Sequence, residues 1–183
     1  MTLPDTIASL EQQIVDPTVG LPEEIFLFAT RITPMVNVDL LVRDKAGRTL
    51  LAWRNDAFSG QGWHIPGGII RFRETFAQRI LKVALTELGT PVEFDPTPIA
   101  LHQLILPEQK SRSHFISLLY ACSLPDSFVP ANTGLTPTTT GFLQWHTHCP
   151  DDLLSVHEIY RPYISPGEIV NASSHQPVTR RFP

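Results

Sequence analysis

The stretch GWHIPGGIIRFRETFAQRILKVALTELG, residues 62–89, decides the fold of this chain. It opens with a turn that carries two adjacent glycines, Gly67 and Gly68, where the missing side chains let the backbone approach a ligand closely. A helical pattern follows over residues 74–88 and ends at Gly89, a residue type favoured just past a helix C-terminus. We therefore expect a glycine loop that leads directly into a long helix.

One face of this helix is apolar, as expected for a helix that packs on a sheet. The face carries Phe76, Ala77, Ile80, Leu81, Val83, Ala84 and Leu88. Glu87 falls on the same face, and a buried carboxylate must be protonated, paired with a cation or bound to a metal. Two interpretations stay open: Glu87 is partly exposed and paired with a Lys or Arg, or it joins a free carbonyl of the glycine loop as an oxygen ligand for Mg²⁺ or Mn²⁺.

The spacing of this stretch resembles the Nudix box, the loop and helix signature of hydrolases that act on nucleoside diphosphates linked to another group. Gly68 is followed by five residues and Glu74, then by twelve residues and Glu87, then by one residue and Gly89. The resemblance implies an α/β (α+β) fold of the Nudix-like α/β/α sandwich type, with a mixed β-sheet between helices. It also implies that Gly68, Glu74 and Gly89 serve the structure of the box.

The box departs from its usual pattern at two pairs of positions. Lys82 and Val83 stand where an Arg-Glu pair is usual, and Thr86 precedes Glu87 where two adjacent glutamates are usual. These replacements resemble the GDP-mannose mannosyl hydrolases, whose box keeps only the second of those glutamates. The hairpin sequence ITPMVNVDLLVRDKAGRTLLAWR, residues 32–54, resembles the first hairpin of that branch.

A box that offers one strong carboxylate ligand favours one metal ion over two or three. One Mg²⁺ on Glu87, the Gly67 carbonyl and the substrate would neutralise a departing nucleoside diphosphate but would be poorly placed to generate hydroxide as well. We therefore expect a Mg²⁺-dependent enzyme that attacks the sugar carbon of a nucleotide sugar and releases nucleoside diphosphate and sugar, as the resembling branch does.

The resemblance assigns further catalytic and substrate-binding residues. Arg54 would contact the diphosphate, because its planar fork suits phosphate oxygens, although a solvated charge at the strand end is the alternative. Lys82 takes the place of the box arginine, or it is simply solvated. Asp39 would lie near the sugar or base, or it is a hydrogen-bonded residue of an open strand face. His114 matches a histidine at the equivalent strand start in that branch.

Two departures bear on activity. The branch carries a histidine base that aligns near Thr139 and Thr140, which have no useful basicity at neutral pH. His146 and His148, a short way downstream, are the candidates to replace it. The branch also has an arginine directly after the two glycines, where this chain has Ile69.

The remaining elements follow from hydrophobic periodicity and turn signals. Expected strands cover residues 36–42, 49–54, 98–106, 114–122 and 141–146, and expected helices cover 3–15, 22–30 and 156–164. We expect a helical extension over 1–20, the Nudix domain over 21–164, and an extended tail over 165–183. The polar segment 125–140 is expected as a lid near the site.

Composition limits the partners. The chain has 183 residues, 42% of them hydrophobic, and a formal net charge of −4, which argues against nonspecific binding to nucleic acid. The two cysteines suggest neither a disulfide framework nor a zinc site, and no apolar run approaches the roughly 20 residues that span a bilayer. We expect a cytoplasmic location, no membrane partner and, by resemblance, a homodimer.

Two other functions compete with nucleotide-sugar hydrolysis. The chain could be a pyrophosphohydrolase of another nucleotide, which would require carboxylates from outside the box, such as Glu93 or Glu108, to converge on it. It could instead be a catalytically silent Nudix-like module that binds a nucleotide or a protein. The absent base and the absent arginine favour that last alternative.

Overall fold

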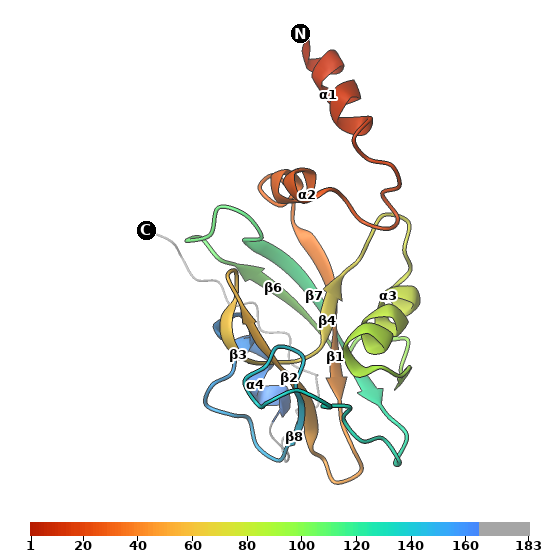
Figure 1. Cartoon of the computed structure of the whole chain (residues 1–183), viewed down its shortest axis with the longest axis vertical. Coiled ribbons are helices and arrows are strands. Elements are labelled where there is room, and N and C mark those ends of the chain that lie inside the picture. The colour runs from red at the N-terminus through yellow and green to blue at the C-terminus, as the bar shows by residue number, and fades with distance from the viewer. Residues whose placement is uncertain (165–183) are drawn as a thin grey trace.

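The computed structural model describes residues 1–164, so the expected tail at 165–183 lies outside the described part. Within that part, eight strands form two sheets, one in the order β4-β1-β7-β5 with β6 also on β7, the other in the order β3-β2-β8 (Figure 1). The strands are β1 (Met35–Val42), β2 (Thr49–Asp56), β3 (Gly60–His64), β4 (Gly67–Ile69), β5 (Glu93–Phe94), β6 (Ala100–Ile105), β7 (His114–Ser123) and β8 (Leu143–His146).

The first sheet is mixed, because β1 runs parallel to β7 while its pairing with β4 is antiparallel. Apolar side chains of β1 pack on both faces, as expected of a strand covered on both sides. Val38, Leu40 and Val42 share one core with the box helix, and Leu41 shares another with Tyr160 of the C-terminal helical segment. The expected α/β class with a mixed sheet between helices is confirmed.

The box helix begins later than the periodicity indicates. It consists of α3 (Phe76–Val83), with Thr75 as its N-cap in a reciprocal capping box with Gln78. Glu74 therefore precedes the cap, where the expected helix had it in the first turn. The physical reason is that the Thr75 hydroxyl, which accepts from the Gln78 N–H at 3.2 Å, satisfies the helix start.

The end of the box helix is a π-helical turn, η1 (Ala84–Leu88), followed by Gly89 at φ 73°. A π-helical turn closes over one residue more than an α-helical turn, and such turns are frequent at functional sites. Hydrophobic periodicity assumes a uniform α-helix and gives no sign of it. The wider turn contains Glu87.

The buried face of this helix is narrower than expected. Ile80, Val83, Ala84 and Leu88 are buried as expected, whereas Phe76, Ala77 and Leu81 are exposed. Arg79, a charged residue, is buried instead. Its guanidinium turns back to Glu74, which explains why a cation lies inside this face.

Two helices precede the sheets. α1 (Leu3–Glu11) projects from one end of the molecule and has no buried residue, and α2 (Glu23–Ala29) lies closer to the sheets (Figure 1). At the other end of the described chain, the 3₁₀ helix η2 (Ser155–Tyr160) runs into α4 (Arg161–Ile164). No helix among residues 1–164 is long and apolar enough to cross a bilayer.

Candidate active site

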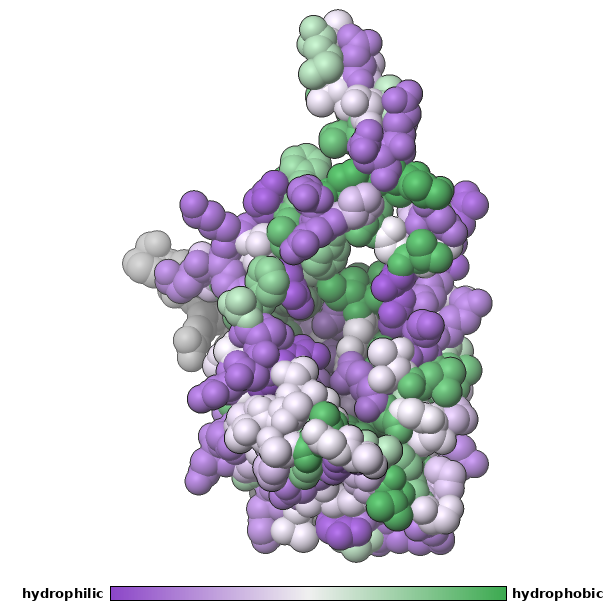
Figure 2. Space-filling model, viewed as in Figure 1, coloured by the Kyte–Doolittle hydropathy of each residue, from purple (hydrophilic) through white to green (hydrophobic). Residues whose placement is uncertain are grey.

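A cavity of about 700 Å³ opens beside the glycine turn. Its walls come from the segment before α2, from α2 itself, from β1 through β4, and from α3, β7 and η2. Figure 2 shows this face of the molecule hollowed between the N-terminal helices and the sheets. A smaller cavity of about 80 Å³ has Asn37, Asp39 and Arg54 among the residues that it shares with the first, so the two are adjacent at these residues.

Glu87 meets the glycine turn at the open edge of the first sheet. Antiparallel residues alternate in the direction of their backbone groups, and the Pro66 carbonyl and the Ile70 N–H bond to β1 at 2.8 Å. Gly67 therefore directs its N–H and its carbonyl away from β1, toward the outer edge. There the Gly67 N–H donates to Glu87 Oε1 at 3.4 Å, a long and weak hydrogen bond.

The Glu87 carboxyl has little else to stabilise its charge. Its pKa is raised to about 7, because burial and, to a smaller extent, the charge of Asp39 outweigh Arg54 and the Gly67 N–H, which lower it. None of the ion pairs among residues 1–164 includes Glu87. The structure therefore contradicts the alternative that Glu87 forms a direct ion pair with a Lys or Arg of residues 1–164.

Both glycines of the turn are required by close contacts. A Cβ on Gly67 would lie 2.1 Å from Asp39 Oδ1, and a Cβ on Gly68 would lie 2.8 Å from Val83 Cγ2. Val83 occupies the position where the usual box has a glutamate, and here it packs against the turn. The position therefore serves packing.

Asp39 is a buried carboxylate, and two hydroxyl groups donate hydrogen bonds to one of its oxygens. Its Oδ2 accepts from the Ser117 hydroxyl at 2.5 Å and from the Tyr160 hydroxyl at 2.8 Å, while Oδ1 faces Gly67. The pKa of Asp39 is raised to about 6, because burial outweighs the two hydrogen bonds and the charge of Arg54, which lower it. Its 3% exposure contradicts the alternative of an open strand face.

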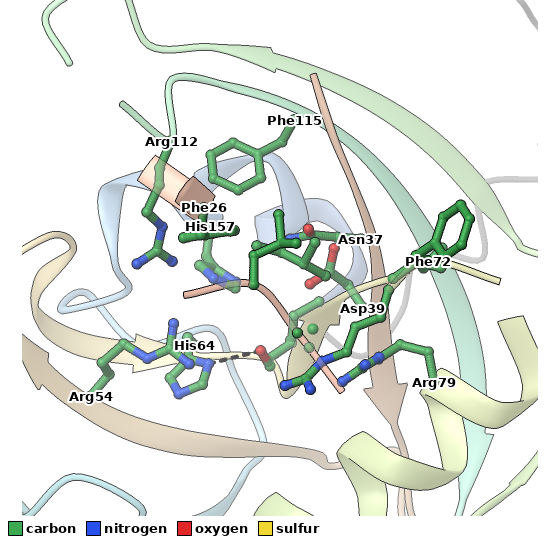
Figure 3. A pocket seen from close by; sticks show the side chains of 18 of the residues that line it. Phe26, Asn37, Asp39, Arg54, His64, Phe72, Arg79, Arg112, Phe115 and His157 are labelled. Atoms are coloured by element: carbon green, nitrogen blue, oxygen red, sulfur yellow. Dashed lines mark hydrogen bonds between the residues drawn. The ribbon is translucent and has the colours of Figure 1, made fainter. Parts of the chain in front are cut away.

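Four arginines give the cavity its positive charge: Arg54, Arg71, Arg79 and Arg112. Figure 3 shows Arg54 and Arg112 on one side of the cavity and Arg79 on the other, with Asp39 between them. The side chain of Arg79 also passes beside Gly68, with its Cδ 3.4 Å from the position a Cβ would take there. Ile69 lines the same cavity without a charge, so the positive charge of the cavity comes from these arginines.

Residues 33–165 match the NUDIX domain family. The chain belongs to the Nudix family. Among curated proteins, the low-salt glycan biosynthesis protein Agl8 of Haloferax volcanii is 30% identical over 89 residues, which cover 49% of this chain and 56% of that protein. The match therefore spans only about half the length of that relative.

Solved Nudix structures share the fold. The MutT NUDIX hydrolase from Burkholderia pseudomallei superposes with a TM-score of 0.56 at 21% identity, over 69% of this chain and 95% of that one. A NUDIX hydrolase from Nitrosomonas europaea gives 0.52 at 21% identity, over 72% and 70%. At such identities the structural similarity supports the fold alone. The family match confirms the resemblance to the Nudix box at the level of the family.

Two histidines of the Nudix cavity were missed by sequence reasoning. His64 and His157 both line it, with ring centroids 5.5 Å apart. Burial and the charge of Arg54 lower both pKa values, that of His157 to about 3, so both rings are neutral at neutral pH. His64 stands just before the glycine turn in the sequence, which was an available signal, whereas only tertiary packing brings His157 there.

Other candidate residues lie outside the cavity. Lys82 is exposed on the outer flank of α3. His114 pairs with Gln103, whose Nε2 lies 2.9 Å from His114 Nε2. Glu93 and Glu108, which a site with several metals would need, are both exposed and line neither of the two adjacent cavities.

The segment expected as a lid packs elsewhere. Residues 125–140 line neither of these cavities, and Thr140 Oγ1 accepts from the Asn55 N–H at 3.0 Å, which ties the segment to the end of β2. The candidate bases downstream are also remote: His146 stacks edge-on against Trp63 at 4.5 Å, and His148 is exposed. The expectation of a lid is wrong, because this segment is bound to the second sheet.

Proposed function

We propose that this Nudix domain hydrolyses a nucleoside diphosphate sugar in the presence of a divalent cation and releases nucleoside diphosphate and sugar. The observation that carries the proposal is the contact of Glu87 with Gly67, because Gly67 lines a cavity that also presents four arginines. Within a chain of net charge −4, that local concentration of cations suits a substrate with several phosphate charges.

Nudix hydrolases generally use a divalent metal such as Mg²⁺, and the donor groups present fit one such ion. Glu87 and the Gly67 carbonyl offer oxygen ligands on the same side of β4, and oxygen ligands suit Mg²⁺ or Mn²⁺. Among residues 1–164, no three His, Cys, Asp or Glu side chains gather into a metal site, so phosphate oxygens of the substrate would complete the ligand set. A bound ion supplies neutralisation of the diphosphate charge.

The arginines would hold the diphosphate from two sides. Arg54 lines the cavity and interacts electrostatically with both Glu87 and Asp39, so its charge lies near both carboxyls. Arg79 is fixed by its hydrogen bond to Glu74 at 2.7 Å. We assign to Arg79 the role near the diphosphate that the box pattern gives to Lys82, since Lys82 faces solvent.

Asp39 would lie on the sugar side. Its Oδ2 is occupied by two donors, which fixes the carboxylate and leaves Oδ1 toward the cavity. An oxygen held in this way can accept a hydrogen bond from a sugar hydroxyl or from the attacking water. We do not assign His114 to substrate binding, because its side chain contacts Gln103.

The test is a product analysis. GDP-mannose and a panel of other nucleotide sugars are incubated with the full chain and Mg²⁺, and the products are separated. Free sugar supports attack at carbon, whereas sugar phosphate would assign the alternative pyrophosphohydrolase. Thermal stabilisation by nucleotide without turnover of any substrate would select the silent binding module.

A pair of variants connects this assay to the site. Glu87→Gln removes the carboxylate at the glycine turn and is expected to lower the metal-dependent rate by more than about 100-fold, above the effect usual for groups that only support a ligand. Glu93→Gln changes an exposed glutamate outside the site and should leave the rate unchanged. Full metal-dependent activity in Glu87→Gln would refute the site.

A further inference from the structure

One wall of the cavity is built by residues that precede the family-matched part of the chain. The NUDIX domain match begins at residue 33, yet Gly20, Leu21 and Phe26 line the cavity. Gly20 has φ +125°, and a Cβ there would lie 3.0 Å from a guanidinium nitrogen of Arg71. Residues before the family-matched part therefore contribute directly to the site.

Two aromatic rings line the cavity on this side, one of them from the wall itself. Phe26 of α2 and Phe115 of β7 both line the cavity, and Figure 3 shows them near Arg112 on one side, away from Arg79. Both side chains are only partly buried, because they face an open cavity. Aromatic rings of this kind offer a stacking surface for a planar ligand group.

α2 also fixes the position of Arg112. The backbone of Arg112 has φ 55°, which is uncommon for a residue other than glycine. Its N–H donates to Thr30 Oγ1 at 3.1 Å, and Thr30, the C-cap of α2, is only 3% exposed. The hydroxyl of Thr30 thus holds a left-handed residue whose side chain enters the cavity.

Two buried polar atoms on this side have no partner in the part of the chain that the structure describes. They are Asn37 Oδ1 and His157 Nδ1, and both residues line the large and the small cavity. A buried acceptor without a donor is costly, so it indicates a missing hydrogen-bonding group. For Asn37 Oδ1 that group must carry an N–H or an O–H.

We propose that this side of the cavity is the nucleoside subsite. The base packs against Phe26 and Phe115, an N–H on its edge donates to Asn37 Oδ1, and Arg112 holds the adjacent phosphate. Thr30 is a positioning residue for Arg112. The assignment rests on the proposed function, because it names what binds the leaving nucleoside diphosphate.

The experiment measures binding of GDP, ADP, UDP and CDP to the full chain by calorimetry, with inorganic pyrophosphate as a probe that lacks a nucleoside. Phe26→Ala is expected to weaken the best nucleoside diphosphate by about tenfold or more and to leave pyrophosphate unchanged. Phe28→Ala is the matched control, since Phe28 is on the same helix, 45% exposed, and lines neither cavity. The proposal is overturned if none of the four binds, or if Phe26→Ala affects both kinds of probe equally or neither.

Two further variants test the polar contacts. Asn37→Leu should abolish the preference among the four bases. An unchanged preference would exclude the contact between Asn37 and the base, and would assign Asn37 to a sugar hydroxyl. Thr30→Val should weaken pyrophosphate several-fold through Arg112, whereas Thr30→Ser, which keeps the hydroxyl, should restore wild-type affinity. Equal affinity in these two variants would overturn the role of Thr30.

These readouts separate the subsite from the reaction. Binding of a product requires no turnover, so a chain that hydrolyses no nucleotide sugar but shows the Phe26 dependence would refute the proposed function and support the subsite. A chain that hydrolyses nucleotide sugars with unchanged product affinity in Phe26→Ala would do the reverse.

Discussion

Glu74 and Glu87 stand at the two ends of the same box helix, and the fold treats their carboxylates in opposite ways. Glu74 Oε2 accepts from the Arg71 N–H at 2.9 Å and from Arg79 Nε at 2.7 Å. Glu87 has a single contact at 3.4 Å, and burial raises its pKa to about 7. A carboxylate with two good hydrogen-bond donors stabilises the fold, whereas one with a single long contact, beside a glycine of the cavity wall, has capacity for a ligand.

The largest expected effect is the pH dependence of stability that Glu87 introduces. Its pKa is about 7 in the folded chain against an ordinary value of 4.5, so the folded state binds more protons between these values and stability falls as pH rises. The fall should reach about 3 kcal/mol above pH 7. Urea unfolding without metal is measured from pH 4 to 8 in the unmodified chain and in Glu87→Gln. The fall in unfolding free energy should be smaller by this amount in Glu87→Gln. The difference between the two chains separates the effect of Glu87 from the parallel effect of Asp39.

Added Mg²⁺ makes that comparison more specific. A cation favours the charged carboxylate, so Mg²⁺ should raise the unfolding free energy of the unmodified chain at pH 8 and have no such effect on Glu87→Gln. If both chains respond equally, the ion binds elsewhere.

The next effect concerns the satisfied carboxylate. Glu74→Gln leaves the largely buried Arg79 without its ion pair, and we expect a loss of about 2 kcal/mol in the free energy of unfolding. Glu158→Gln is the control, because Arg161 and Glu158 make a pair of the same 2.7 Å distance at an exposed position, worth less than about 1 kcal/mol. Similar losses in both variants would show that burial does not distinguish the two pairs.

A smaller effect on stability is expected at Asp39, whose carboxylate has two donors on one oxygen and so is intermediate between Glu74 and Glu87. Ser117→Ala and Tyr160→Phe each remove one donor from Oδ2, and each should lower stability by about 1 kcal/mol in denaturant titrations. Ser123→Ala, at the exposed end of the same strand β7 as Ser117, serves as the control. A change no larger than in that control would mean that the two hydroxyls do not support the carboxylate.

The smallest effect should come from a cation of the same helix. Lys82→Ala is expected to alter the unfolding free energy by less than about 0.5 kcal/mol and the hydrolysis rate by less than about twofold, because Lys82 is exposed. Both quantities are measured beside Arg79→Leu, which removes a cavity cation. A rate in Lys82→Ala as low as that of Arg79→Leu would return the diphosphate role to the box position.

Much of the fold could be predicted because it depends on local patterns. The strand around residues 36–42, the helix that ends at Gly89 and the β7 strand all followed from periodicity and turn residues. The glycine turn was expected as a loop but forms the edge strand β4, since its backbone finds partners on β1. Pairing of that kind is a long-range event that local propensity does not reveal.

The sequence by itself determined the box: its two glycines, the single carboxylate at Glu87 and the absence of companions at Val83 and Thr86. Only the tertiary structure decided the surroundings, namely the π-helical turn, the inward position of Arg79 and the wall that Phe26 provides. The reason is physical. Spacing within one helix fixes which residues are neighbours along it, whereas burial, charge pairing and pKa depend on distant segments that packing brings into contact.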